Sequence, residues 1–258
     1  MRYEILGPLR IIDRDGPSFI SARKIEILLA TLLIRADHLV PTDQLIVEIW
    51  GDQPPRRATA GLHVYISELR KFLNRSGGPD NRIVTRMPGY QLNLGSDEID
   101  VHDFLRLVDE GRNHARDHRR AEAADCFERA LGLWRGAVHG DPPTGPMVEA
   151  FITWLTEVRM ECTEMLIDAQ LQLDRHRELV GRLYSLTAEH PLRESFYRQL
   201  MLALYRSERK ADALRVYQSA RRMLNTELGL EPCRALQDVH RAILAADDRI
   251  LLDAYAHA

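Results

Sequence analysis

The sequence predicts a mainly α-helical fold with a small β component. A winged helix-turn-helix over residues 1–95 is followed by an all-α, tetratricopeptide-like helical repeat domain over residues 96–258. Two observations predict this arrangement. In the first part, short strand-like segments, three amphipathic helices and a hairpin follow one another. From about Ile99 onward the apolar spacing is almost wholly helical, and related segments recur. The 258 residues, 45% apolar and 28% charged, suit one or two ordinary globular domains.

The chain opens with three short segments that are typical of strands, because Gly-Pro and Asp-Gly pairs between them favour tight turns. They are YEILG (3–7), PLRII (8–12) and SFI (18–20). Two helices are expected next, over residues 24–35 and 44–50, since each places its apolar side chains on one face. Thr42 is the expected N-cap of the second helix, and Gly51 is placed to end it.

The third helix, ATAGLHVYISELRKFLN (58–74), has two unlike sides. The apolar side, which would anchor it on the core, comprises Leu62, Tyr65, Ile66, Leu69, Phe72 and Leu73. The side that would project comprises Thr59, His63, Ser67, Arg70 and Lys71, and it is preceded by Arg56 and Arg57. An α-helix fits the major groove of B-DNA, where such side chains can bond base edges or phosphates. Composition alone favours a merely solvated face, because most polar helix faces are solvated.

A β-hairpin is predicted over RIVTRMPGYQLNL (82–94). Pro88 and Gly89 favour the centre of a type II turn, because proline fixes φ and glycine accepts a positive φ. The alternating inward positions are expected to be Val84 on one arm and Tyr90, Leu92 and Leu94 on the other. Arg86 is left exposed near the tip. Strands, three helices and a terminal hairpin together describe a winged helix.

The second part contains three related segments with small and aromatic residues where paired helices touch. They are AEAADCFERALGLW (121–134), ELVGRLYSLTAEHP (178–191) and ADALRVYQSARRML (211–224). The last two are offset by 34 residues, the tetratricopeptide period. The first is separated by an insertion that holds a Gly/Pro-rich loop over residues 135–147. Stacked repeats leave a concave surface that suits a binding partner.

Several long motifs carry a family resemblance. LGPLRI (6–11), LLATLLIRADHLVPTDQLIVEIWGDQPP (28–55), LHVYISELRKFL (62–73) and IVTRMPGYQL (83–92) closely resemble the DNA-binding domain of the Streptomyces antibiotic regulatory protein family. The fold of that domain is similar to the OmpR-type response-regulator effector domain. Residues 99–112 and 202–232 resemble the bacterial transcriptional activation domain of the same family.

The resemblance implies a sequence-specific transcriptional activator of biosynthetic genes. It implies that the third helix reads promoter DNA, that Arg86 in the wing reaches an adjacent minor groove, and that the sites are direct repeats near the −35 region. The implied partners are double-stranded promoter DNA and RNA polymerase holoenzyme, including its sigma factor, with a homodimer or DNA-induced oligomer. We expect neither a receiver-like segment with a phosphoacceptor Asp before the winged helix nor the nucleotide-hydrolysing domain of longer members.

Charge, hydropathy and the cysteine and histidine positions favour a DNA-binding protein over a membrane protein, a secreted protein or a metalloenzyme. The formal charge is +3 over residues 1–95 and −6 over the rest, which suits a polyanion-binding N-terminal domain. With no run of about eighteen apolar residues and no signal peptide, we expect a cytoplasmic protein, nucleoid-associated when bound to DNA. We expect Cys126, Cys162 and Cys233 to be reduced core cysteines. His114 and His118 have helical i, i+4 spacing but no third ligand, and we expect no metal, no cofactor and no catalytic site.

Two competing functions remain. The first is an adaptor or sensor whose repeat domain binds a peptide or small molecule while the winged helix contacts a protein. Apolar anchors on the projecting face of the third helix would favour it. The second is an enzyme, which the absence of a clustered acid–base or nucleophile motif disfavours.

Overall fold

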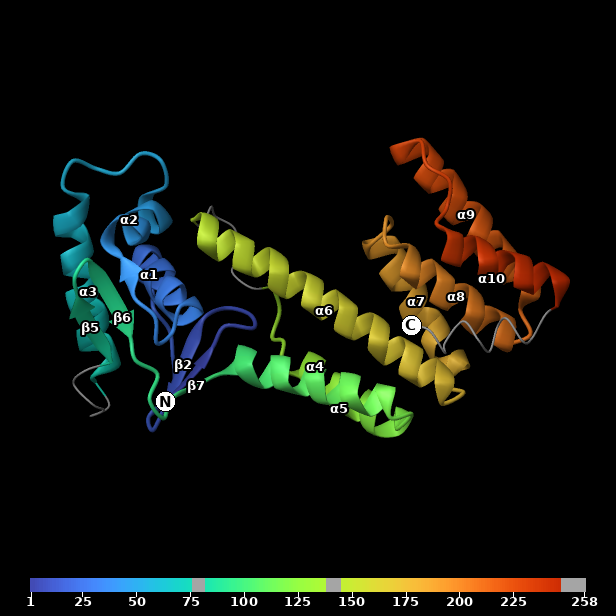
Figure 1. Ribbon diagram of the computed structural model, residues 1–258, viewed down its shortest axis with the longest axis horizontal. Helices are drawn as coiled ribbons and strands as arrows, with labels where there is room; N and C mark the ends of the chain where they lie inside the picture. Colours follow the sequence, from blue (N-terminus) through green and yellow to red (C-terminus); the bar gives the residue numbers. More distant parts are fainter. Residues whose placement is uncertain (76–81, 138–144, 247–258) are drawn as a thin grey trace. The chain divides into compact units, whose positions relative to one another are not determined.

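The computed structural model describes residues 1–75, 82–137 and 145–246. Its contacts define two compact units, shown in Figure 1. The first contains residues 1–107 and 129–160, and the second contains residues 108–128 and 161–258. Both are mostly helical, as predicted. The domain boundary expected after residue 95 stays a prediction.

The first unit begins with a sheet that holds the N-terminal strands. Its order is β3-β2-β1-β7, formed by Gly16–Ser18, Arg10–Asp13, Arg2–Glu4 and Glu98–Ile99. The strands β1 and β2 are antiparallel, with Tyr3 opposite Ile11, whereas β1 and β7 are parallel. The strand β7 was not predicted, because two residues are too short for a periodic signal.

Three helices follow, as the apolar spacing predicted. They are α1 (Arg23–Ile34), α2 (Thr42–Trp50) and α3 (Ala58–Leu73). Each contacts the other two, and fully buried leucines lie on all three. Gly51 ends α2 with φ 65°, as expected. Thr42 is not the N-cap: α2 begins at Thr42 itself, and its hydroxyl donates instead to the Pro88 carbonyl, 2.9 Å away.

A three-stranded sheet of order β4-β6-β5 forms the wing, from Val40–Pro41, Gly89–Leu92 and Ile83–Arg86. The predicted inward position on the first arm was wrong by one residue. Ile83, opposite Leu92, is buried, whereas Val84 is half-buried. Because successive strand residues face opposite sides, this shift exchanges the two faces of β5.

The predicted type II turn is also wrong. The peptide bond between Met87 and Pro88 is cis, and Gly89 does not have a positive φ. Glycine is needed at this position for a different reason. A Cβ atom on Gly89 would lie 2.0 Å from the Val40 carbonyl oxygen and 2.8 Å from the Pro41 Cα, so only glycine lets β6 approach β4 this closely.

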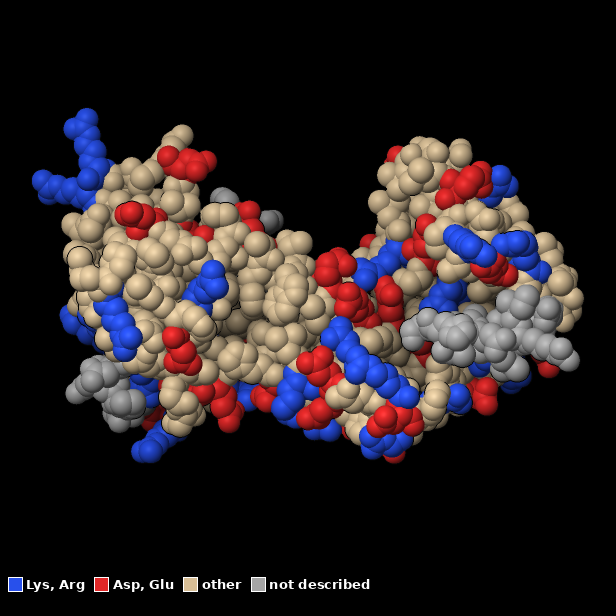
Figure 2. Space-filling model, in the orientation of Figure 1, with Lys and Arg blue, Asp and Glu red and all other residues tan. Residues whose placement is uncertain are grey.

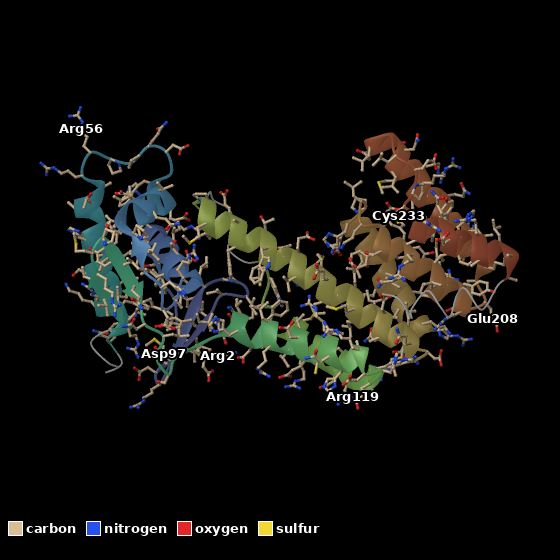
Figure 3. All side chains as sticks on the ribbon, viewed as in Figure 1. Arg2, Arg56, Asp97, Arg119, Glu208 and Cys233 are labelled. Carbon is tan, nitrogen blue, oxygen red and sulfur yellow. The ribbon has the colours of Figure 1, made fainter. Side chains whose placement is uncertain are left out.

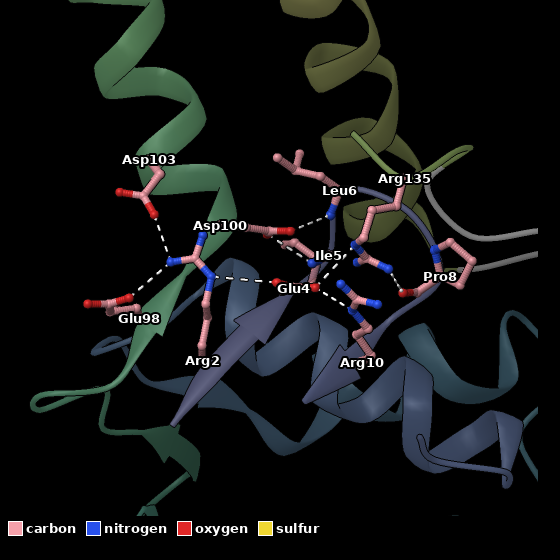
Figure 4. Close-up of polar contacts among 10 residues, drawn as sticks. All are labelled: Arg2, Glu4, Ile5, Leu6, Pro8, Arg10, Glu98, Asp100, Asp103 and Arg135. Atoms are coloured by element: carbon pink, nitrogen blue, oxygen red, sulfur yellow. Dashed lines mark hydrogen bonds and ion pairs between the residues drawn. The ribbon is translucent and has the colours of Figure 1, made fainter. Parts of the chain in front are cut away.

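A polar network joins the N-terminal strands to the start of α4 (Asp100–Arg116) (Figure 4). The buried Asp100 carboxylate accepts hydrogen bonds from the Ile5 and Leu6 amides at 2.9 and 3.1 Å. Burial raises the pKa of Asp100 above its ordinary value, although the two amide donors oppose this effect. Glu4 pairs with Arg135 at 3.2 Å. These contacts tie residues on both sides of residue 95 into one compact unit.

A second carboxylate extends the same unit. Glu48 of α2 is buried and accepts hydrogen bonds from the Met147 and Val148 amides at 2.8 and 3.2 Å. These amides belong to the first turn of α6 (Pro146–Gln172) and have no partner within the helix. Glu48 is therefore an N-terminal cap supplied from another helix.

The second unit is wholly helical in the residues that the structure describes. Besides parts of α4 and α6, it contains α5 (Arg120–Gly132, divided between the units), α7 (His176–Glu189), α8 (Glu194–Arg206), α9 (Lys210–Leu228) and α10 (Arg234–Ala245). The starts of α7 and α9 repeat the 34-residue offset. Phe127 of α5 is fully buried and packs on Gly111 of α4, as small and aromatic positions of a repeat should. The loop predicted over 135–147 falls largely on residues 138–144, which lie outside the described residues.

Candidate nucleic-acid interface

The helix α3 is held on the first unit by the apolar side that the sequence predicted. Leu62, Ile66, Leu69 and Leu73 are buried, while Tyr65 and Phe72 are half-buried. The Tyr65 ring stacks on Trp50 of α2, with 5.6 Å between ring centroids. This seam fixes the helix about its own axis and therefore decides which residues project.

Four of the predicted reading residues project from α3. Thr59, His63, Ser67 and Lys71 are exposed, and none forms a hydrogen bond or ion pair with a residue that the structure describes. Their polar atoms are thus available to a ligand without breaking a contact with any described residue. Spaced four residues apart, they lie along one stripe of the helix.

Two further basic residues precede the stripe. Arg56 and Arg57 are exposed in the connection between α2 and α3, where Arg56 extends away from the body of the unit (Figure 3). Basic side chains protrude at the same corner of this unit in Figure 2. Neither arginine has a partner among the described residues. Both suit contacts with phosphates beside the groove that α3 would enter.

Arg70 differs from the other predicted reading residues, because its guanidinium is bound within the chain. Its Nε donates to the Ile83 carbonyl at 3.0 Å, and a terminal nitrogen donates to the Thr85 hydroxyl at 2.9 Å. The group also lies 5.9 Å from the centre of the Tyr90 ring. Arg70 therefore connects the last turn of α3 to β5 and β6 of the wing. This geometry favours a positioning role, while its base contact stays an untested prediction.

Two residues on the projecting side were missed by the sequence reasoning. Val64 is 54% exposed, and Glu68 is exposed beside it on the next turn. An exposed methyl group suits the methyl of thymine, and a carboxylate can accept from the amino group of cytosine. The signal was present: four-residue spacing places both on the side opposite Leu62 and Leu69.

The tip of the wing presents Arg86 and Met87 to solvent. Arg86 is exposed, as expected, and has no partner among the described residues, while Met87 is 91% exposed. The turn itself is held firmly. Both the amide and the hydroxyl of Thr42 donate to the Pro88 carbonyl, at 3.0 and 2.9 Å. The exposed side chains thus extend from a fixed backbone.

No group of three or more His, Cys, Asp or Glu could hold a metal ion within the described ranges. No described helix is long and apolar enough to cross a membrane. Cys126 and Cys162 are buried, and burial raises the pKa of Cys162 to about 12, so its thiol stays protonated at neutral pH. Cys233 was wrongly expected in the core: it is exposed, because it stands at the N-cap of α10.

Two family models match nearly the whole chain. Residues 20–92 match the C-terminal domain of transcriptional regulatory proteins, and residues 99–244 match the bacterial transcriptional activator domain. A winged helix of OmpR type joined to such a domain defines the class as a transcriptional regulator.

Similar proteins narrow this class. The regulatory protein DnrI of Streptomyces peucetius is 34% identical over 257 residues, covering 97% of this chain and 94% of DnrI. The regulatory protein AfsR of Streptomyces griseus is 34% identical over 250 residues, but the chain spans only 25% of its length. The chain belongs to the Streptomyces antibiotic regulatory protein family. In structure it is similar to Mycobacterium tuberculosis EmbR, solved with a low-affinity phosphopeptide. The TM-score is 0.90 at 30% identity, over 99% of this chain and 69% of that one.

Proposed function

We propose that the protein is a sequence-specific DNA-binding transcriptional activator of genes for antibiotics or other secondary metabolites. The observation that carries this proposal is the projecting side of α3, where Thr59, His63, Ser67 and Lys71 are exposed and unpaired among the described residues. Side chains that are only solvated do not have to be aligned along one side of a helix. A stripe held by a buried seam and flanked by unpaired arginines is what major-groove reading needs.

The dimensions of α3 suit a duplex. From Thr59 to Lys71 the helix extends over about 18 Å at 1.5 Å per residue. This length equals roughly five base pairs at 3.4 Å each. We assign base contacts to His63, Val64 and Ser67 near the middle of the stripe. Lys71, Arg56 and Arg57 would neutralise phosphates on either side.

The wing would add a second contact. A narrow, A·T-rich minor groove concentrates negative potential and attracts arginine. Arg86 is exposed on a turn that Thr42 holds in place, so only its side chain, and not the backbone of the turn, has to become ordered when it enters such a groove. Arg70 would set the distance between this contact and α3.

The repeat domain would present contacts to RNA polymerase holoenzyme, including its sigma factor, and support a homodimer or DNA-induced oligomer. We propose direct repeats near the −35 region as the binding site. Direct repeats require a head-to-tail arrangement of two DNA-binding domains, because a two-fold pair would favour a palindrome. Such an activator acts in the cytoplasm, on the nucleoid.

Selection of bound duplexes from a random DNA pool, followed by footprinting on DNA that flanks the gene, tests the proposal. We expect an enriched site with two similarly oriented halves. Its affinity should fall as salt rises, because phosphate contacts release counterions. The variant Lys71→Ala should weaken binding, whereas Arg234→Ala, an exposed change in α10, should not. Failure to enrich any duplex would reject DNA binding and favour the adaptor. An adaptor would need several apolar anchors on the exposed side of α3, where Val64 is the single large apolar side chain.

A further inference from the structure

An open groove of about 530 Å³ lies along helices α7, α8 and α9 of the second unit. Its volume is within the range of ligand pockets, about 300–1,000 Å³. The floor is apolar and formed by buried side chains, Tyr197 and Leu200 of α8 and Val216 of α9. The helix α8 contacts both α7 and α9 (Figure 1), and the lining residues of α7 and α9 form the walls of the groove.

The two walls differ in chemistry. On the α7 side, Tyr184 is 43% exposed, so part of its ring is open to a ligand above the apolar floor. On the α9 side, Arg209 and Arg215 both pair with Asp212. Two guanidinium groups share one carboxylate, so this wall carries one net positive charge.

The arginines keep donors for a ligand. A guanidinium has five N–H groups, and each arginine uses one nitrogen on Asp212. Their other nitrogens have no partner among the described residues. Arg215 retains 80% side-chain exposure, so its free edge can meet an anion without losing the pair with Asp212.

The length of the groove matches a short extended peptide. Along α9 the lining runs from Asp212 to Ser219, which is about 10 Å at 1.5 Å per residue. Three residues of extended peptide cover the same distance at about 3.3 Å each. A tripeptide of this length could place one large apolar side chain above Leu200 and its neighbouring residues beside Tyr184 and Arg215.

We propose that this groove binds a short acidic segment of another protein, with a large apolar side chain on the floor and a carboxylate on Arg209 and Arg215. A carboxylate gains charge-assisted hydrogen bonds from two guanidiniums already held in place by Asp212. A basic segment would meet the net positive wall and be rejected. This site lies on different helices from α3 and does not depend on DNA binding.

Selection of displayed random heptapeptides on the intact protein tests the proposal, with the affinity of the most enriched peptide measured by fluorescence anisotropy. We expect peptides in which Asp or Glu flanks Leu, Phe or Tyr. Arg215→Glu should weaken binding about tenfold or more and make it less dependent on salt. Tyr184→Ala should also weaken it. Arg221→Glu is the matched control, because Arg221 lies on α9 outside the groove and pairs with Glu231.

The folding controls and the binding results together decide whether the groove binds an acidic peptide. Both groove variants change exposed side chains, so their circular dichroism and unfolding midpoint should match the parent chain, and Arg209→Glu provides a second test if Arg215→Glu does not fold. No enriched peptide, enrichment without acidic residues, or equal binding by the parent, Arg215→Glu and Tyr184→Ala would overturn the proposal. Gel shift with the selected duplex separates the two proposals, because Arg215→Glu should leave DNA affinity unchanged.

Discussion

Replacing Arg70 by alanine tests whether this side chain fixes the wing or reads a base. Its two hydrogen bonds, to the Ile83 carbonyl and the Thr85 hydroxyl, are 3.0 and 2.9 Å long. A hydrogen bond from a charged group contributes about 1.5–3 kcal/mol when buried. The bond to Ile83 is partly buried and the bond to Thr85 is exposed, so the second contributes less. We expect Arg70→Ala to lower the free energy of unfolding by about 2 kcal/mol.

Urea unfolding followed by circular dichroism measures this change. Thr85→Val removes one partner, and a double-mutant cycle should give a coupling energy of about 0.5–1 kcal/mol between the two residues. Lys71→Ala is the matched control, because Lys71 is the next residue, is exposed and has no partner among the described residues. Its effect on stability should stay within about 0.5 kcal/mol.

DNA binding then separates the two roles. If Arg70 positions the wing, Arg70→Ala weakens binding mainly where the flanking DNA is A·T-rich, as Arg86→Ala does, and leaves the preference at the base pairs under α3 unchanged. If stability is unaltered while preference changes at one base pair, by about 1–3 kcal/mol, the side chain reads a base. That second result would refute the positioning role inferred from the structure.

Five further predictions concern stability and DNA binding. Gly89→Ala should lower the free energy of unfolding by about 2–4 kcal/mol, because its Cβ would meet the backbone of β4. Gly181→Ala, where a Cβ meets nothing within 4 Å in α7, should raise the same quantity by about 0.5–1 kcal/mol in the same urea titration. Lys71→Ala should weaken all duplexes alike and reduce the salt slope in gel shift by about 1; a flat salt response of the parent would contradict phosphate contact. Arg86→Ala should reduce affinity mainly where the flanking DNA is A·T-rich, and a loss independent of the flank would argue against minor-groove insertion. The raised pKa of Asp100 means that the native state holds its proton more tightly than the unfolded state, so its contribution to stability falls as pH rises above its ordinary pKa of 3.8. The free energy of unfolding of Asp100→Asn, measured from pH 4 to 7, should therefore increase relative to that of the parent chain as pH rises.

Much of the fold follows from periodicity. The helix over residues 58–74 and its buried side were predictable, because Leu62, Ile66, Leu69 and Leu73 recur at helical spacing. The hairpin was predictable in existence but not in register. Ile83 and Val84 are both β-branched and apolar, so only the pairing of Ile83 with Leu92 decides which one faces inward.

The details that failed depend on distant partners. Thr42 is a good N-cap by residue type, but its hydroxyl donates to the carbonyl of Pro88, 46 residues later in the chain. The reason for Gly89 is the backbone of β4, which no local pattern reveals. Arg70 was placed correctly on α3, yet its bonds to β5 could be found only with the wing in position.

Glu48 and Asp100 have a consequence for recombination between relatives. Each carboxylate holds two main-chain amides that belong to a segment far away in the chain. A chimaera that exchanges the first 95 residues for those of another family member replaces Glu48 and the two amides that donate to Asp100, but keeps their partners. Such a swap should keep both contacts only where the incoming module carries an acidic residue at the place of Glu48 and presents two main-chain amides that donate to Asp100. Compatible exchanges are therefore limited by these buried contacts rather than by the sequence of the reading helix.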